Sequence, residues 1–167
     1  MSFVPGPETE RQFREALGRF ATGVTVVTCE GPDGPTGITA NSFASVSLDP
    51  PLVLWSPSRG SSRYPAFRDA EAFAIHVLGE DQRHIGAAFA RHPHDAFGSG
   101  VVPIRQGVPV IEGCLARFVC ARHAVFEAGD HDIVVGRVLR AQVRSGGPLI
   151  FSGGRYGSFA PHHPDGP

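Results

Sequence analysis

Short β-branched and apolar stretches, each ended by Gly, Pro or Asp, run through most of this 167-residue chain. Residues 24–28 are β-branched throughout, and a turn follows at Pro32-Asp33-Gly34-Pro35. Strands are expected at residues 24–28, 36–40, 44–48, 52–56, 73–77, 114–127, 132–144 and 148–151. Many short strands with few helices favour a mainly β fold, namely a mostly antiparallel barrel.

A few short helices are expected beside these strands. Residues 9–21 carry apolar side chains at helical spacing, and Thr9-Glu10-Arg11-Gln12 has the capping-box pattern. Further helices are expected near residues 64–70 and 81–91, the second with Phe89 on its apolar side.

The chain contains no internal repeat or linker. We therefore expect a single domain over residues 1–167, with its core at about 9–160 and a disordered tail at 161–167. Residues 92–109 form a long loop rich in Gly and Pro, which we expect to act as a lid.

The composition excludes several classes of function. The 15 basic residues are all arginine, which excludes phosphate loops that need Gly-Lys and lysine Schiff-base chemistry. A formal net charge of -1 gives no general attraction to nucleic acid, and no apolar run is long enough to span a membrane. Residues 1–10 do not resemble a signal peptide, so a cytoplasmic protein without a nucleic-acid or membrane partner is expected.

The cysteines and histidines do not suggest a metal site. Cys29, Cys114 and Cys120 are odd in number and lack Cys-x-x-Cys spacing, so we expect reduced core thiols. His92 and His94 lack a nearby Cys or Glu partner, and no metal is expected. The Rossmann Gly-x-Gly-x-x-Gly and the hydrolase Gly-x-Ser-x-Gly motifs are also missing.

The densest polar cluster covers residues 39–47, where small hydroxyl and amide side chains alternate with apolar ones. Such a lining suits the edge and face of a flat heterocycle, although a plain pair of Ser/Thr-rich edge strands has the same pattern. The candidate ligands here are Thr39, Ala40, Asn41, Ser42, Ser45, Val46 and Ser47.

A second cluster follows a predicted strand and precedes a predicted helix. Hydroxyls, backbone N–H groups and a helix N-terminus together suit a phosphate, to which Arg59 or Arg63 could add charge-assisted bonds. A solvated turn is the alternative. The candidates are Ser56, Ser58, Ser61, Ser62 and Arg63.

Two glycine-containing segments are the third and fourth candidate ligand-binding clusters. In Gly129-Asp130-His131, an imidazole that can donate or accept near neutral pH lies at a strand junction, although this segment taken alone favours a plain turn. In the segment at residues 153–157, Arg155 and Tyr156 could stack on a ligand, or form an ordinary C-terminal turn.

In this order the four clusters resemble the flavin reductase-like family, the short-chain reductases that serve two-component flavin-dependent monooxygenases. The specific feature is Thr39-Ala40-Asn41-Ser42 with Asp49-Pro50-Pro51 and, further on, Gly129-Asp130-His131. The resemblance covers residues 13–159 and is carried by residues 13–28, 37–43, 45–53, 73–78, 129–131 and 155–157.

The resemblance implies an FMN-binding split β-barrel, antiparallel and Greek-key-like, that forms a homodimer. It implies an NAD(P)H:flavin oxidoreductase, which uses NADH or possibly NADPH to reduce FMN or FAD for a partner monooxygenase. By the same resemblance, residues 39–47 line the isoalloxazine and residues 56–62 hold the flavin phosphate. His131 would be the catalytic residue beside the nicotinamide, with Phe89, Arg155 and Tyr156 as further cofactor contacts.

Two departures from the family pattern stand out. His76 occupies a position where related chains often carry Asn, and the phosphate loop has no lysine, which leaves FMN and FAD both open. Two alternatives also stay open on the same barrel: a carrier or sensor that binds flavin or haem without turnover, and an oxidase acting on a vitamin-like phosphate ester.

Overall fold

The computed structural model describes residues 2–91, 97, 104–105 and 107–161. Its helices are η1 (Pro7–Thr9), α1 (Glu10–Leu17), α2 (Tyr64–Asp69), η2 (Glu80–Gln82) and α3 (Arg83–Arg91). Its strands are β1 (Thr22–Gly23), β2 (Thr25–Gly31), β3 (Gly34–Ala40), β4 (Ala44–Leu48), β5 (Pro51–Trp55), β6 (Ala72–Val77), β7 (Ile104–Arg105), β8 (Val108–Pro109), β9 (Ala116–Ala128), β10 (His131–Val143), β11 (Leu149–Ser152) and β12 (Arg155–Ser158).

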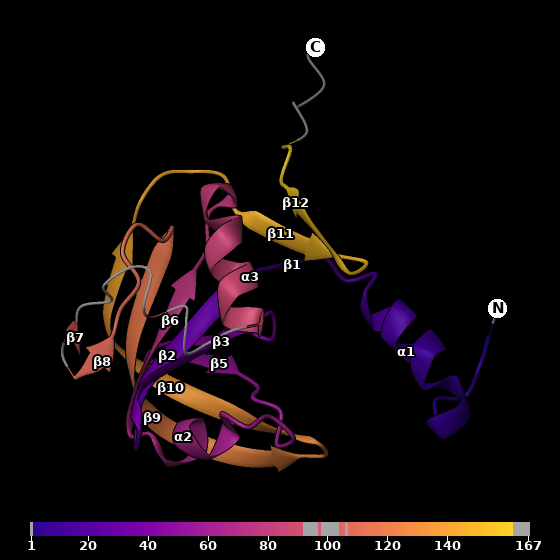
Figure 1. Ribbon diagram of the computed structural model, residues 1–167, viewed down its shortest axis with the longest axis horizontal. Helices are drawn as coiled ribbons and strands as arrows, with labels where there is room; N and C mark the ends of the chain where they lie inside the picture. Colours follow the sequence, from indigo (N-terminus) through magenta and orange to yellow (C-terminus); the bar gives the residue numbers. More distant parts are fainter. Residues whose placement is uncertain (1, 92–96, 98–103, 106, 162–167) are drawn as a thin grey trace.

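One antiparallel sheet of seven strands, in the order β3-β2-β6-β9-β10-β5-β4, forms the body of the molecule (Figure 1). In a flat sheet of this width the two edge strands would lie about 29 Å apart. The edge strands β3 and β4 are joined by residues 41–43 alone, and the chain from Ala40 to Ala44 spans at most about 15 Å. The sheet therefore curls until its two edges meet at this corner, and the mainly β, antiparallel prediction is confirmed.

The core fills the inside of this curl. Trp55 makes an edge-to-face contact with Phe67 of α2 at 5.0 Å between ring centroids, and α2 thereby covers one end. The central strand β6 is buried on both faces, because Phe73 and Ile75 enter the main core while Ala74 packs against Val108 on the other side. The main core comprises Val27, Cys29, Val53, Trp55, Phe67, Phe73, Ile75, Cys120 and Val134.

A smaller sheet, β1-β11-β12, lies between the body and α1, and α1 extends away from the body (Figure 1). Strands β1, β7, β8 and β12 were not predicted from the sequence, because they are too short to show a period, and the loop predicted at residues 92–109 is therefore wrong where β7 and β8 pair. The first helix was predicted too long: α1 ends at Leu17, and the chain then turns. The predicted capping box on α1 is absent: the Thr9 hydroxyl accepts a bond from the Gly6 N–H at 2.9 Å instead.

The three cysteine thiols are free, and Cys29 and Cys120 are buried as expected, whereas Cys114 is only partly buried. Burial raises the pKa of both Cys29 and Cys120 to about 12, so these two thiols are inert. None of the described helices is long and apolar enough to cross a membrane. The lid prediction and the tail prediction rest largely on residues 92–96, 98–103, 106 and 162–167, which lie outside the described residues, as do His92 and His94.

A fully buried histidine, His76 of β6, joins three segments. Its Nδ1 lies 2.9 Å from the Val26 carbonyl of β2, and its Nε2 accepts the Ile111 N–H at 3.0 Å. Both ring nitrogens are satisfied only if the ring is neutral with its proton on Nδ1. Desolvation by burial lowers the pKa of His76 to about 4. The departure from Asn noted in the sequence therefore creates a neutral hydrogen-bonded bridge in the core.

His76 should make the protein sensitive to mild acid. Between pH 6.5 and about 4 the unfolded chain binds a proton that the folded chain excludes, so the free energy of unfolding falls as the pH falls through this window. The full effect is about 3 kcal/mol, and it is absent above pH 6.5. Urea unfolding at several pH values, compared with His76→Asn, measures it; an equally steep decline in the variant would contradict the assignment.

Candidate active site

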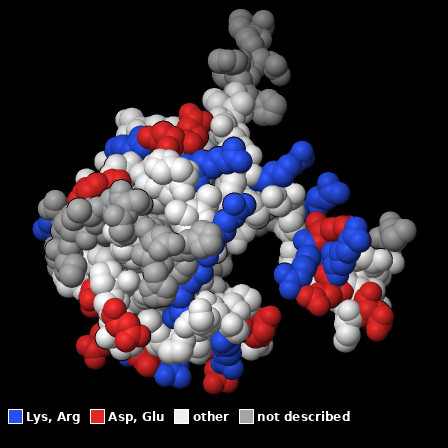
Figure 2. Space-filling view, viewed as in Figure 1, with Lys and Arg blue, Asp and Glu red and all other residues white. Residues whose placement is uncertain are grey.

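A cleft of about 830 Å³ opens between α1, the corner that joins β3 to β4, and the start of β10. It brings Asn41 and Ser42 together with His131, although some 90 positions separate them in the chain. Figure 2 shows a hollow between the body and the charged α1 region. The lining residues are Arg14, Leu17, Gly18, Phe20, Thr22, Asn41, Ser42, Phe43, Ala44, His131, Phe151 and Gly154.

The corner after β3 is held by its own side chains. Ser42 Oγ accepts the Ser56 N–H at 2.9 Å and lies 3.3 Å from the Ser56 carbonyl, which fixes the corner to the end of β5. Phe43 stacks on Phe118 at 5.7 Å between ring centroids. The Asn41 amide has no hydrogen-bond partner among the described residues, and it also borders a pocket of about 200 Å³. The corner therefore presents to the cleft an exposed amide that is available to a ligand.

Three other predicted ligands border the smaller pocket, namely Thr39, Ala40 and Tyr156. The Thr39 hydroxyl lies 2.6 Å from the Gly86 carbonyl of α3, so it ties β3 to that helix. The Tyr156 ring contacts Phe151 at 5.4 Å and lies under the Arg83 guanidinium at 5.6 Å. These side chains build the wall where the small sheet meets the body.

His131 begins β10, where an adjacent carboxylate orients its ring. Its Nδ1 lies 2.8 Å from Asp130 Oδ1, and this hydrogen bond lowers the pKa of the Asp130 carboxyl. With the proton on Nδ1, Nε2 is left without a partner among the described residues. The Gly-Asp-His turn thus supplies an oriented imidazole to the same cleft as Asn41.

The predicted phosphate loop after β5 packs directly against this turn. Ser58 pairs with His131 in an isolated β-bridge, and the Ser61 carbonyl accepts the Tyr64 N–H at 3.0 Å, which leads the chain into α2. Ser56 and Ser58 are half-buried. The Arg59 guanidinium forms ion pairs within the protein: its Nη2 lies 2.6 Å from Asp132 Oδ1 and 3.4 Å from Glu127 Oε1.

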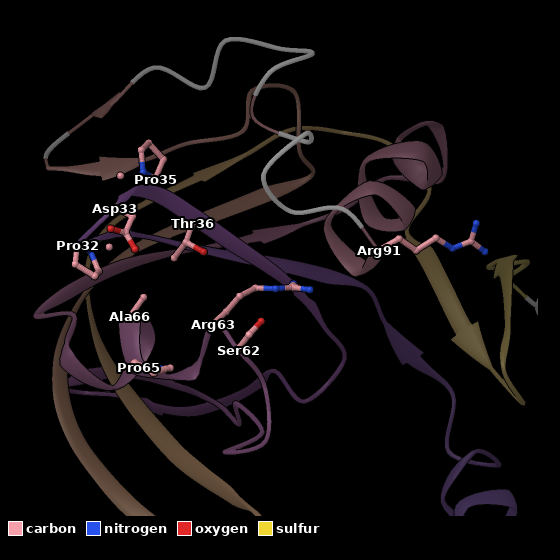
Figure 3. A pocket seen from close by; sticks show the side chains of 11 residues that line it. Pro32, Asp33, Pro35, Thr36, Ser62, Arg63, Pro65, Ala66 and Arg91 are labelled. Carbon is pink, nitrogen blue, oxygen red and sulfur yellow. The ribbon is translucent and has the colours of Figure 1, made fainter.

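Ser62 and Arg63 line a different cavity, of about 540 Å³, which shares no lining residue with the His131 cleft (Figure 3). Arg63 extends into the molecule, where its Nη1 donates to the Phe89 carbonyl at 2.8 Å and to the Gly37 carbonyl at 3.2 Å. Burial lowers the pKa of Arg63, and its Nε is buried without a partner in the described part of the chain. Arg63 therefore joins β3 to the end of α3.

The remaining predicted ligands lie apart. Ser45, Val46 and Ser47 belong to the exposed edge strand β4, which bulges between Ser45 and Ser47. Phe89 is buried in the core beside Phe97. Arg155 is exposed on β12. Their roles in cofactor binding stay predictions.

The sequence analysis did not assign α1 or β1 to the site. Arg14, Leu17 and Phe20 form one wall of the cleft, and Thr22 contributes a buried hydroxyl without a partner among the described residues. The available signal was the apolar face of residues 9–21, a pattern that usually indicates a helix packed on a core. The structure leaves this face exposed, with Phe20 79% exposed.

The chemistry of the cleft fits a flavin. A flat ring needs apolar side chains over its faces and hydrogen-bonding groups at its edge. Leu17, Phe20 and Phe151 supply the first, and the free Asn41 amide with the corner backbone supplies the second. Among the described residues, no group of three or more His, Cys, Asp or Glu side chains could hold a metal ion.

Comparison with known proteins decides the family. The model of the "Flavin reductase like domain" matches residues 17–160. The chain belongs to the flavin reductase-like family. This membership confirms the resemblance seen in the sequence.

Members of this family with assigned activities are close in sequence and structure. The chain is 60% identical over 159 residues to FMN reductase (NADH) SmoA of Agrobacterium fabrum, covering 95% of this chain and 91% of that one. It is 48% identical over 140 residues to the reductase component of the flavin-dependent trigonelline monooxygenase of Acinetobacter baylyi, covering 83% of this chain and 45% of that longer one. The NADH:FAD oxidoreductase SgcE6 of Streptomyces globisporus, solved with NAD and FAD fragments, superposes with a TM-score of 0.86 at 39% identity, covering 96% and 98% of the two chains.

The position of Arg63 yields a prediction that separates a structural role from a ligand role. Arg63→Met should lower the free energy of unfolding by about 1–3 kcal/mol, because two carbonyls lose their donor. Urea unfolding without flavin measures this effect. Arg91→Met, at a cavity residue directed away from Arg63 in Figure 3, is the control. Unchanged stability with weakened flavin binding would make Arg63 a ligand instead.

Proposed function

We propose that this chain is an NADH-dependent flavin reductase whose active site is the cleft between α1, the β3–β4 corner and the Gly-Asp-His turn. The observation that carries the proposal is the meeting of Asn41 and Ser42 with His131 in one cleft. The activities of the relatives, FMN reduction with NADH in one and NADH:FAD oxidoreduction in another, support it.

A bound flavin supplies the hydride acceptor and a reduced nicotinamide supplies the hydride, so the protein's task is binding and orientation. The Asn41 amide would bind the polar edge of the flavin ring, on a corner fixed by Ser42. Leu17, Phe20 and Phe151 would exclude water from the ring faces. His131, oriented by Asp130, would hold the nicotinamide through Nε2.

The two alternatives from the sequence fit the geometry less well. A carrier or sensor needs no second ligand site beside the flavin, and such a function would leave the oriented His131 at the cleft without a role. An oxidase of a vitamin-like phosphate ester needs free basic ligands in the loop after β5. Arg59 and Arg63 are both bound by protein acceptors there.

We also propose that the reduced flavin passes to a separate flavin-dependent monooxygenase. The Acinetobacter baylyi relative is the reductase component of such an enzyme. The open cleft, which is lined by an exposed part of α1, would let a flavin enter and leave. Both FMN and FAD are candidates, because different relatives use each, and NADH is favoured over NADPH as the donor.

The predicted homodimer has support in the apolar surface of α1. None of its side chains is buried: Phe13 and Leu17 lie exposed four positions apart on the helix, and Phe20 lies exposed just beyond its C-terminal end. An amphipathic helix that extends from the body needs a partner surface, and a second copy is the partner that we propose. The single-domain organisation and the cytoplasmic location stay predictions from the sequence.

Removal of the His131 imidazole tests the proposed function. His131→Ala should lower kcat/KM for NADH by about tenfold or more, because the nicotinamide loses its positioning contact. NADH oxidation at 340 nm, with and without added FMN or FAD, measures it, and His123→Ala on the exposed part of β9 is the control. Absence of flavin-dependent oxidation by the native chain would refute the reductase.

A measurement of the oligomeric state tests the proposed homodimer. Sedimentation equilibrium of the native chain should give twice the 17.7 kDa monomer mass. Phe13→Glu should shift the equilibrium towards monomer, because it places a charge on the apolar face of α1. A fully active native monomer would contradict the dimer.

A further inference from the structure

The loop after β5 and the Gly-Asp-His turn are joined by a continuation of the β5–β10 ladder. Within the ladder Trp55 faces Val134, and the Ser58–His131 bridge falls in the same register beyond the end of β5. The Arg59 N–H donates to the Asp130 carbonyl at 2.9 Å, and the Asp132 N–H donates to the Pro57 carbonyl at 3.1 Å. These two bonds flank His131, so its backbone position depends on the loop after β5.

A buried carboxylate, that of Asp132, strengthens this junction between the loop after β5 and the start of β10. The Asp132 side chain is 5% exposed, whereas that of its neighbour His131 is 43% exposed, because successive side chains of β10 point to opposite faces. Arg59 Nε donates to Asp132 Oδ1 at 2.7 Å, and the Tyr64 hydroxyl donates to Oδ2 at 2.5 Å. Both oxygens are therefore used, one by the loop and one by the first residue of α2.

The electrostatics of the cluster agree with this geometry. The hydrogen bond from Tyr64, together with Arg59, lowers the pKa of Asp132, and the same hydrogen bond raises the pKa of Tyr64. The carboxylate is thus ionised near neutral pH and strongly accepts both bonds. Asp132 itself does not line the cleft, so its influence on a ligand must pass through the segments that it holds.

We propose that Asp132 is the positioning residue of the site, setting the spacing between His131 and the loop at residues 56–62. This inference rests on the proposed function, in which His131 holds the nicotinamide, and on the expectation from the sequence that residues 56–62 hold the flavin phosphate. Each ligand alone needs only one of these segments. Hydride transfer needs both at a fixed separation, because small displacements of the reacting groups are costly.

Asp132→Asn tests this role, since it preserves the side-chain shape and removes the charge. The flavin dissociation constant, from quenching of flavin fluorescence, and the KM for NADH should change little, because each ligand keeps its own segment, whereas kcat should fall by about tenfold. Hydrogen exchange should accelerate at the Arg59 and Asp132 amides while the β2–β6 ladder stays protected. Tyr64→Phe, which removes only the bond to Oδ2, should show the same changes to a smaller extent.

Asp81→Asn is the matched control. Asp81 also pairs with an arginine, Arg144, at 2.9 Å, but at the opposite end of β10 from His131. Its kinetics should equal those of the native chain. If Asp132→Asn keeps native kinetics, or if its amides exchange faster everywhere alike, the positioning role is overturned. A native chain without NADH-dependent flavin reduction would instead refute the proposed function, and the exchange measurement would still decide whether Asp132 holds the junction.

Discussion

The antiparallel pairing of β9 with β10 is the interaction on which the rest of the structure depends. These are the longest strands, and the pair holds β6 on one side and β5 on the other. Irregularities beside Gly136 and between Val138 and Arg140 allow the pair to bend. At Gly136 a Cβ atom would lie 2.5 Å from the Phe73 ring, so only glycine permits this approach of the pair to the core. The bend makes the curl possible and brings His131 to the rim.

The site forms where the curled sheet fails to close. Its edge strands β3 and β4 meet at residues 41–43 without pairing, and the ends of the β9–β10 and β11–β12 hairpins lie at the same rim. Backbone and side-chain groups at such a seam are left available for a ligand, because no neighbouring strand uses them. The position of the cleft therefore follows from the strand order, and the side chains at the seam decide what it binds.

Much of this fold could be predicted from the sequence, since strand periods and turn residues are local signals. Residues 44–48 become β4 as expected, and the long predicted strands become β9 and β10. The partners of single polar side chains could not be predicted, because they depend on distant backbone. Arginine is a typical phosphate ligand, yet Arg63 donates to the Gly37 carbonyl of β3 and the Phe89 carbonyl of α3. The sequence did not indicate a role for Asp132, because its partners Arg59 and Tyr64 lie about 70 positions earlier.

For the site itself, the sequence placed Asn41, Ser42 and His131, which the structure brings into one cleft. It missed the wall formed by α1, because an apolar helical face normally indicates a core contact. Such a pattern cannot distinguish a helix buried in its own domain from one that stays exposed. The wall at Leu17 and Phe20 belongs to the second kind.

The use of arginine bears on how firmly a flavin would be held. The chain has no lysine, and two arginines near the proposed phosphate loop, Arg59 and Arg63, are engaged by Asp132 and by backbone carbonyls. Phosphate recognition there would rest on serine hydroxyls and backbone N–H groups, which bind more weakly than free guanidinium groups. A site of this kind favours a flavin that is exchanged over one that is permanently bound. Under the proposed function, such a site would let the reduced flavin leave for a separate monooxygenase.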